Sequence, residues 1–411
     1  MKNNNNAKSG SLTGGILLVT GTAIGAGMLA LPVMTAFAGF FPSLLLLGVG
    51  WLFMFITALL LLEVSLAIEG ESNMISMAQH TLGRWGSIIS WLVFPLLLYS
   101  LTAAYIAESA PLVLQAYEAT TGTSLPERAG PLPLLIIFGA FVYLGTKSVD
   151  YINRLLMLGL VFAYIALVIF VPQHLDRQLL THVDMKPLLI GLPTVINAFN
   201  AHNIIPSLTT YMGRDKGKLR LALLIGTLIP CLGYTLWECL TLGAVPLKGD
   251  HGLLSAWIKG EGATGPLVYV LNNRGVKIAA QLFSFFAILT SFLGVALSLS
   301  DLLTDGFRIK RSSSGRFIAC MLTFAPPLFF VYAHQGVFLL ALHYANAFVI
   351  ISSCLLPTLM AWTLPKTSGL RSFFGRCLLV TVLIFSLFVA IVGLIATQGG
   401  LNTLIEHYIQ T

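Results

Sequence analysis

The stretch VTGTAIGAGMLALP, residues 19–32, places three glycines, two threonines and a proline inside a long apolar run. A helix in the hydrocarbon core of a membrane must pair its backbone polar groups internally, and glycine and proline weaken that pairing. Free N–H groups at a break suit a carboxylate, and free carbonyls suit an ammonium group or a cation. We therefore interpret residues 21–27 as an unwound hinge in a binding site. Close helix packing through Gly21 and Gly25, a GxxxG face, is the alternative.

A second interrupted stretch is LPTVINAFNAHNIIPSLTTYM, residues 192–212. It carries three asparagines and a histidine between residues 197 and 203, flanked by Pro193 and Pro206. Polar side chains at membrane depth face a cavity or another helix, because lipid cannot pair them. We expect this segment to line the same site as the first break.

The composition places both stretches in a membrane. Of the 411 residues 56% are hydrophobic and only 9% are charged, whereas a soluble domain is about 25% charged. No acidic or basic residue occurs between Ser9 and Leu62, a run long enough to cross a bilayer at least twice. The five cysteines have no metal-ligand spacing, and we expect neither a metal site nor a cofactor. The chain is predicted to be an all-α polytopic membrane protein.

Eleven apolar windows bounded by polar, glycine or proline residues predict eleven spans. They lie near residues 12–39, 42–68, 86–117, 132–147, 151–172, 187–211, 219–246, 276–303, 315–333, 336–363 and 375–397. With the N-terminus inside the cell, the cytoplasmic segments hold 16 of the 23 basic residues. This asymmetry predicts a cytoplasmic N-terminal tail, residues 1–11. Because no long polar block interrupts the spans, residues 12–411 are expected to form one transmembrane domain. It also explains the net charge of +7 without a nucleic-acid partner.

Two segments between the spans have apolar residues of their own. Residues 72–86 are predicted to form a short amphipathic helix on the cytoplasmic surface. The outer segment 248–275 is either a plain interfacial loop or a lid over an outer vestibule.

The two breaks lie at corresponding positions, each about ten residues into its span, in spans one and six. Since five spans separate them, the two halves would insert with opposite orientation. Paired interrupted helices in inverted halves are typical of secondary transporters, which bind substrate between them. The pattern therefore predicts a transporter.

Four segments resemble the bacterial aromatic amino acid permeases: SLTGGILLVTGTAIGAGMLALPVMTAFAGF, GTKSVDYINRLLMLGL, the IPS…YMG run that ends span six, and FFAILTSFLGVALSLSDLLTDG. The resemblance covers nearly the whole chain. It implies a permease of the amino acid–polyamine–organocation superfamily with the LeuT-like five-plus-five inverted repeat. Repeat one would run over about 12–172, repeat two over about 187–363, and an extra eleventh helix over about 375–397. Its expected activity is import of tyrosine or tryptophan with protons into the bacterial cell across the inner membrane.

With the resemblance added, the substrate site is expected where spans one, three, six and eight meet. Main-chain atoms of the first break would hold the carboxylate and amino groups, and Phe199 would stack on an aromatic ring. The predicted substrate-binding residues are Thr20, Gly21, Thr22, Ala23, Ile24, Gly25, Ala26, Gly27, Tyr99, Thr102, Phe199, Asn200, Ala201, His202, Asn203 and Ser284. Tyr105 lies on the same span as Tyr99 and Thr102. Each of these side chains could instead have a structural role. The polar residues of span six could form hydrogen bonds between helices, the tyrosines could lie at the membrane interface, and the hydroxyl groups could bond to carbonyls of their own helix.

The coupling cation needs a titratable group or a cage of oxygen atoms. Intramembrane acids are rare and usually functional, and Glu238, in the middle of span seven, is the most isolated. The candidates are Glu238, His202, Glu108, Thr290 and Ser291. The last two could supply hydroxyl oxygens to Na⁺. Glu63 is interpreted as a partner in a salt bridge near the cytoplasmic end of span two.

Lys147 and Arg154 are interpreted as orientation charges or, alternatively, as a permanent cation in place of sodium. Asp301 and Asp305 are interpreted as part of an inner gate.

An enzyme is not expected, since the sequence has no HExxH, GxSxG or CxxC motif. A channel would not need paired broken helices. The expected partners are a small-molecule amino acid, H⁺ or Na⁺, and the lipid bilayer. The span-six centre AFNAHNIIPS departs from the pattern expected of a tyrosine carrier, so a serine/threonine symporter and a Na⁺-coupled aromatic carrier stay open as alternatives.

Overall fold

The computed structural model describes residues 10–25, 27–68, 73–310, 312–334, 336–365, 369–397, 400 and 402–409. Every regular element in this part of the chain is a helix. Ten helices are long and apolar enough to cross a membrane, and the bent pair α1–α2 would make an eleventh span. The predicted all-α polytopic fold is thus confirmed.

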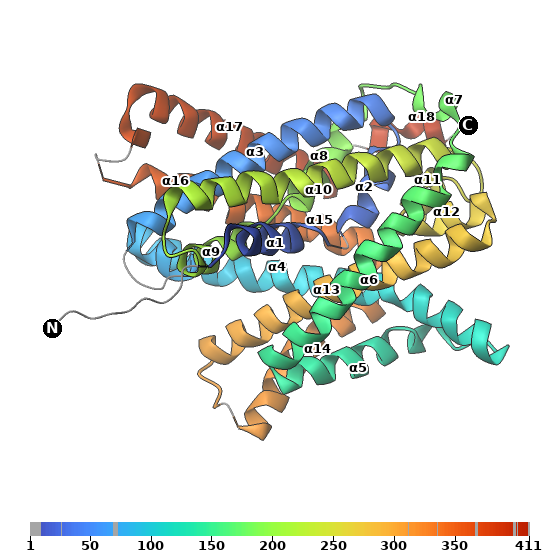
Figure 1. The fold of residues 1–411 in the computed structure, drawn as a ribbon, viewed down its shortest axis with the longest axis horizontal. Coiled ribbons are helices and arrows are strands. Elements are labelled where there is room, and N and C mark those ends of the chain that lie inside the picture. Colours follow the sequence, from blue (N-terminus) through green and yellow to red (C-terminus); the bar gives the residue numbers. More distant parts are fainter. Residues whose placement is uncertain are drawn as a thin grey trace.

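Most of the long helices run roughly along the long axis of the molecule, and α6 crosses this direction obliquely (Figure 1). The spans are α1 and α2 (Leu12–Ala23 and Gly27–Thr35), α3 (Phe40–Ala67), α4 (Met74–Thr121), α5 (Pro131–Leu144), α6 (Thr146–Phe170), α8 and α9 (Leu188–Ala198 and Ile205–Tyr211), α10 (Lys216–Ala244), α13 (Arg274–Gly306), α14 (Ser313–Ala333), α15 and α16 (Val337–Val349 and Leu356–Trp362) and α17 (Phe373–Thr397). The short helices are α7 (Arg177–Leu180), α11 (Leu253–Lys259), α12 (Thr264–Leu271) and α18 (Glu406–Ile409).

The packing separates a bundle from a scaffold. In the bundle, α10 packs along α1 and α3, while α8 packs on α2 and α3, and α9 follows on α3. In the scaffold, α13 packs along α4, α6 and α14, and α15 packs along α4. We call α1, α2, α3, α8, α9 and α10 the bundle, and α4, α5, α6, α13, α14 and α15 the scaffold. One large buried apolar core extends through both groups, and a small second cluster is formed by Leu98, Leu299 and Leu303.

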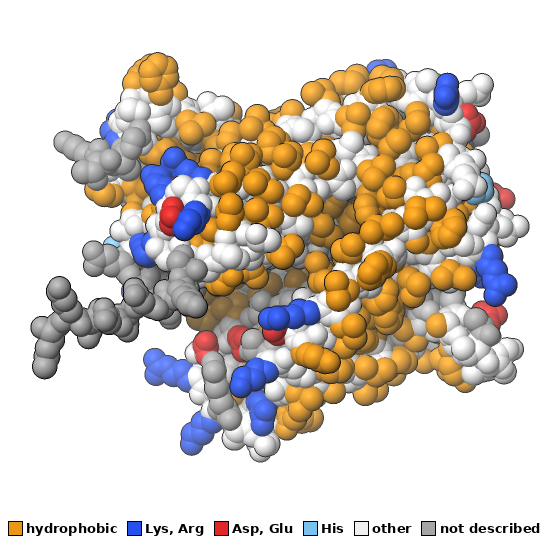
Figure 2. All heavy atoms as spheres, viewed as in Figure 1, with side chains coloured by type: hydrophobic (Ala, Val, Ile, Leu, Met, Phe, Trp, Pro, Cys, Tyr) orange, Lys and Arg blue, Asp and Glu red, His pale blue; other side chains and the backbone are white. Residues whose placement is uncertain are grey.

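The outside of the molecule has the character of a membrane-embedded surface. Hydrophobic side chains cover the middle of the face shown in Figure 2, and Lys and Arg gather mainly at the end where the N-terminus lies. Many large apolar side chains of the molecule are widely exposed, including Phe162, Leu232 and Phe329, which a soluble protein would bury. The chain is therefore a multi-pass membrane protein.

The predicted surface helix at residues 72–86 differs from the structure in one respect. Asn73 begins α4 with a capping box to Ser76, and the helix continues without a separating loop into the third span. Gly83 (φ 68°, ψ −152°) is the one non-helical residue inside α4, and only glycine adopts this conformation easily. The residues from Met74 to Gly83 therefore form a short helix, as predicted, which is joined to span three by a kink and not by a loop.

Candidate functional site

The first break lies between α1 and α2, which meet at an angle of 55°. The α1 helix ends at Ala23 because Ile24 adopts an extended conformation (φ −74°, ψ 115°), although the Ile24 N–H still donates to the Thr20 carbonyl at 2.9 Å. Among the described residues, no hydrogen bond involves the N–H of Gly25 or the carbonyl of Gly21. The sequence thus correctly predicts an interrupted first span. Ala26, one of the predicted site residues, lies outside the described residues.

The second break lies between α8 and α9 and has the same layout. The α8 helix is 11 residues long and α1 is 12, so each break follows a half-helix of similar length. Phe199 ends α8 in a non-helical conformation, and a 3-10 turn, His202–Ile204, leads into α9. Pro206 lies in the first turn of α9, where its missing N–H is not needed. The break predicted for span six is therefore present.

Tyr234 of α10 joins the two breaks. Its hydroxyl lies 2.7 Å from the carbonyl of Ala23 and 3.0 Å from the carbonyl of Ala198, the last residues of α1 and α8. The ring of Tyr234 packs against Phe199 with the ring centroids 5.2 Å apart. The C-terminal ends of both half-helices therefore meet at one buried hydroxyl.

The scaffold contributes Tyr105 and Ser291 to the same region. A Cβ atom added to Gly25 would lie 2.6 Å from Ser291 Oγ, so the first break passes directly against α13. Ser291 also hydrogen-bonds with Tyr105 of α4, which is buried. Beside it, a Cβ atom on Gly27 would meet no protein atom within 4 Å. The side chains of Tyr105 and Ser291 thus lie on the scaffold side of the first break, and there is open space beside Gly27.

Tyr234 is the residue that the sequence analysis missed. It lies one helical turn before Glu238 in GYTLWE, in the middle of span seven. A tyrosine hydroxyl at membrane depth needs a hydrogen-bond acceptor, so its position in the middle of span seven could have indicated a polar contact with a neighbouring helix.

The other span-six residues join the break to neighbouring helices. The Asn200 side-chain oxygen accepts a hydrogen bond from Ser353 Oγ at 2.9 Å, in the π-helical turn Ile350–Leu355 between α15 and α16. His202 Nε2 lies 2.9 Å from Thr57 Oγ1 of α3, and its Nδ1 is buried without a described partner. Ala201 is buried, while Asn203 is exposed on α9's side of the break.

Several predicted hydroxyl groups bond to backbone or to other elements. Thr20 Oγ1 donates to the Gly226 carbonyl of α10, and Thr22 Oγ1 donates to Leu18 within α1. On α4, the Tyr99 hydroxyl donates to the Leu322 carbonyl of α14, and Thr102 donates within its own helix. The Tyr105 side of α4, rather than the Tyr99 side, is thus the one next to Ser291.

On α13, Ser284 Oγ donates to Thr264 Oγ1 of α12 at 2.7 Å. Thr290 Oγ1 donates to the Phe286 and Ala287 carbonyls of its own helix, and Ser291 Oγ donates to the Ala287 carbonyl. Of these three side chains, Ser291 is the one that reaches the break.

The predicted acids lie in different places. Glu238 is fully buried inside the bundle, where the Thr35 hydroxyl of α2 lies 3.0 Å from both of its carboxylate oxygens. Glu108 of α4 lies beside the turn between α11 and α12 and accepts a hydrogen bond from the Gly262 N–H. Arg154 is exposed and pairs with Asp150 one turn away, and Lys147 is exposed as well. These last two side chains are therefore placed as surface charges.

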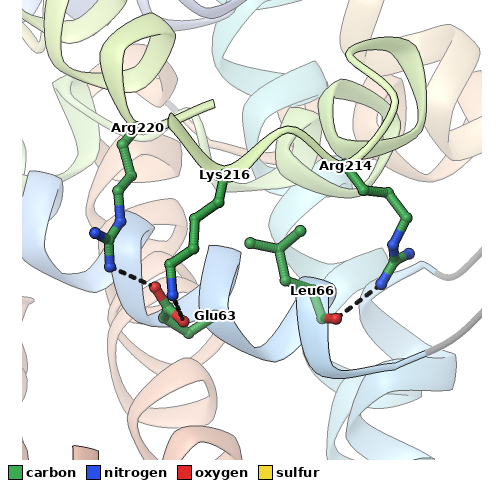
Figure 3. A network of polar contacts seen from close by, with 5 residues as sticks. All are labelled: Glu63, Leu66, Arg214, Lys216 and Arg220. Atoms are coloured by element: carbon green, nitrogen blue, oxygen red, sulfur yellow. Dashed lines mark hydrogen bonds and ion pairs between the residues drawn. The ribbon is translucent and has the colours of Figure 1, made fainter. Parts of the chain in front are cut away.

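Glu63 is paired as predicted, near the end of α3 (Figure 3). Its carboxylate oxygens lie 2.7 Å from Lys216 Nζ and 2.7 Å from Arg220 of α10. Arg214, in the α9–α10 turn, donates to the carbonyls of Ser65, Leu66 and Ile68 and so caps the end of α3. This network joins α3 and α10 at the end of the bundle that holds the N-terminus.

The opposite end of the molecule is closed over the breaks. Residues 248–275 contain α11 and α12, and the Ala263 N–H donates to the Leu29 carbonyl of α2 at 2.9 Å. A Cβ atom on Gly262 would be 2.5 Å from Glu108 and 3.4 Å from Leu29, so this segment lies between bundle and scaffold. This arrangement is the one expected of a lid.

The C-terminal helix α18 also packs at this end. The Tyr408 hydroxyl donates to Asp184 at 3.0 Å and lies 3.3 Å from His182 Nε2. His182 Nε2 lies 3.0 Å from the Phe37 carbonyl in the turn between α2 and α3. Burial, with the Asp184 carboxylate beside it, raises the pKa of Tyr408 to about 12, so the phenol keeps its proton.

Polar residues are exposed towards the other end. Asn203 and Ser207 lie one turn apart on α9's side, and Gly294, Ser298 and Asp301 follow one another along α13. On the face shown in Figure 2, the surface is recessed between α1 and α13. The breaks are therefore closed on the lid side and more open on the side of the N-terminus. Within the described residues, no three His, Cys, Asp or Glu side chains converge as metal ligands.

Comparison with known proteins gives one family. Residues 8–393 match the tryptophan/tyrosine permease family. The chain is 34% identical over 355 residues to tyrosine-specific transport system 1 of Haemophilus influenzae, an alignment that covers 85% of this chain and 87% of that protein. It is 30% identical over 398 residues to the tryptophan-specific transport protein of Shigella flexneri, covering 95% and 96%. The tryptophan-specific transport protein of Haemophilus influenzae is 32% identical over 370 residues, covering 86% and 88%.

Proposed function

The chain belongs to the tryptophan/tyrosine permease family, and from this premise we propose that it imports an aromatic amino acid, tyrosine first and tryptophan second, by proton symport. It is a multi-pass transporter and not an enzyme, in keeping with its relatives. Our proposal places it in a bacterial inner membrane with a cytoplasmic N-terminus, as the distribution of basic residues favours.

The observation that supports this function best is the convergence of the two breaks beside a cluster of aromatic rings. Phe199 and Tyr234 pack together where α1 and α8 end, and Tyr105 reaches the same region through Ser291. Helix N-termini favour a carboxylate and helix C-termini favour an ammonium group. An aromatic amino acid presents both groups and a ring, so it matches all three features of the site.

We place the substrate main chain at the first break. The unpaired N–H of Gly25 would bind the carboxylate, the unpaired Gly21 carbonyl would bind the ammonium group, and the open space at Gly27 would admit both. The side chain would extend towards Phe199, with Asn200 or His202 beside it. Ring stacking on Phe199 contributes about 1 kcal/mol beyond the buried area.

We propose Glu238 as the site of the coupled proton. Its carboxyl group is fully buried and its described hydrogen-bond partner, Thr35, belongs to the second half of the broken span. An unpaired buried charge is costly, so gain or loss of a proton would change the contact between α10 and α2. His202, with an unpartnered Nδ1, and Glu108, under the lid, are the alternative proton sites.

Transport would proceed by alternating access, with the bundle moving against the scaffold. The five-plus-five inverted repeat, with repeat one at about 12–172 and repeat two at about 187–363, would supply the two equivalent broken spans. The lid contacts at Leu29 and Glu108 would open on the outer side as the inner side closes. The structure's closed lid and exposed inner residues correspond to the inward-facing end of this cycle.

The test is uptake of labelled tyrosine and tryptophan into proteoliposomes under an imposed pH gradient or an imposed Na⁺ gradient. Accumulation driven by external acid in sodium-free buffer is the expected result. Sodium-driven uptake would move the coupling site to Thr290, Ser291 and the break carbonyls. Uptake of serine or threonine, without tyrosine or tryptophan, would contradict the proposed substrate.

A further inference from the structure

Tyr234 holds a position where membrane transporters with broken helices commonly bind a cation. The C-terminal end of each half-helix carries roughly half a negative charge, and such ends, with unwound carbonyls, coordinate Na⁺ or H⁺ in this class of site. Here the last carbonyls of α1 and α8 both lie within 3.0 Å of the Tyr234 hydroxyl. Its single hydrogen therefore lies between two acceptors of like partial charge.

We propose that the Tyr234 hydroxyl takes the place of a metal cation between the two half-helix ends, and so sets the geometry of the breaks without sodium. Tyr234 acts as a positioning residue, because its own hydrogen bonds go to the backbone and not to substrate. This inference rests on the proposed function and adds a reason for its sodium independence.

The surroundings of the ring support a fixed position for the hydroxyl. Tyr234 is 1% exposed, and its ring is held against Phe199, itself 2% exposed. The neighbouring Trp237 donates from Nε1 to the Met28 carbonyl of α2 at 3.0 Å. One face of α10 thus contacts the end of α1, the end of α8 and the start of α2. A rotation of α10 would change all three at once.

Tyr164 provides a matched control. Its hydroxyl also donates to a backbone carbonyl of α10, that of Gly233, at 2.7 Å, but it comes from α6 and touches neither break. Tyr164→Phe and Tyr234→Phe therefore each remove one phenol hydroxyl bonded to a carbonyl. Only the second substitution releases the half-helix ends.

The experiment measures equilibrium binding of tyrosine to the purified full chain in detergent, in sodium or choline buffer, together with thermal unfolding. Wild type should bind equally in both buffers. Tyr234→Phe should bind about tenfold more weakly, as expected for buried carbonyls left unpaired, while Tyr164→Phe stays within about twofold of wild type. Both variants should unfold at similar temperatures.

Tyr234→Ser separates a positioning role from a merely structural one, because it leaves space between the carbonyls for an ion. Sodium should strengthen tyrosine binding by this variant and not by wild type. Three results would each overturn the inference. They are stronger tyrosine binding by wild type in sodium, an equal loss of tyrosine affinity in Tyr164→Phe and Tyr234→Phe, and tyrosine binding by Tyr234→Ser that does not respond to sodium. If wild type bound neither tyrosine nor tryptophan, the proposed function would fail instead, and the same series would be run with the amino acid that is transported.

Discussion

Substitution of Gly25 by alanine tests whether the first break must lie against α13. The added Cβ atom would be 2.6 Å from Ser291 Oγ, whereas ordinary contact begins at 3.4 Å. Gly25 does not have a positive φ, so alanine suits its backbone and the effect is one of packing alone. Ser291 Oγ cannot yield freely, because it donates to the Ala287 carbonyl and hydrogen-bonds with Tyr105. Overpacking of this kind costs about 2 kcal/mol, which corresponds to about 30-fold weaker tyrosine binding.

The double variant Gly25→Ala/Ser291→Ala gives the decisive comparison. Without Oγ, the nearest Ser291 atom is its Cβ at 3.6 Å, so the clash disappears and binding should recover to within about threefold of Ser291→Ala alone. Gly48→Ala is the control, since a Cβ there meets no atom within 4 Å and alanine suits a helix better. Equilibrium binding and proteoliposome uptake are measured for wild type and for all four variants, Gly25→Ala, Ser291→Ala, the double variant and Gly48→Ala. The assigned contact would be refuted if Gly25→Ala bound tyrosine as tightly as wild type does. It would also be refuted if the loss of tyrosine affinity in the double variant were the sum of the losses in the two single variants.

Three further substitutions test separate parts of the site. Gly27→Ala should leave the unfolding temperature unchanged, because the added Cβ atom meets no protein atom within 4 Å. It should reduce tyrosine uptake about tenfold, because the methyl group would occupy space that the substrate needs. Normal uptake by this variant would place the substrate elsewhere. Glu238→Gln should abolish the accumulation of tyrosine driven by a pH gradient but retain the exchange of tyrosine across the membrane. Accumulation of tyrosine by this variant under a pH gradient would exclude Glu238 as the proton site. Glu63→Gln removes the ion pairs with Lys216 and Arg220, and it should lower the free energy of unfolding by only about 1 kcal/mol because both basic side chains are about half exposed. The affinity for tyrosine, measured by calorimetry, should not change.

The sequence predicts the spans and both breaks because these depend on local chemistry. Membrane insertion requires long apolar helices, and a glycine cluster or a run of asparagines conflicts with that requirement wherever it occurs. Ile24 and Phe199 end their half-helices where the polar and glycine residues begin. The pairing of Glu63 was predictable for a similar reason, because an acid near the end of a span meets the basic residues concentrated at that end.

The contacts between breaks were not predictable, because they depend on helix rotation. Tyr99 and Tyr105 are six residues apart on α4 and point in directions about 120° apart around the helix axis, so sequence alone does not tell which one faces the site. The structure directs Tyr99 to Leu322 and Tyr105 to Ser291. Ser284 likewise reaches the lid at Thr264 because α12 packs on α13, a tertiary contact without a local signal.

The distribution of polar contacts suggests which parts of the molecule move together. The charged pairs of Glu63 and the Tyr234 bridge join helices within the bundle. Contacts from scaffold to bundle include single neutral hydrogen bonds, such as that from Tyr164 to Gly233, each contributing about 1 kcal/mol. A few such bonds can exchange during a cycle, whereas the bundle's own contacts would have to break together. We therefore expect the two breaks to move as one unit, and the close approach of Gly25 to Ser291 is where that unit contacts the scaffold.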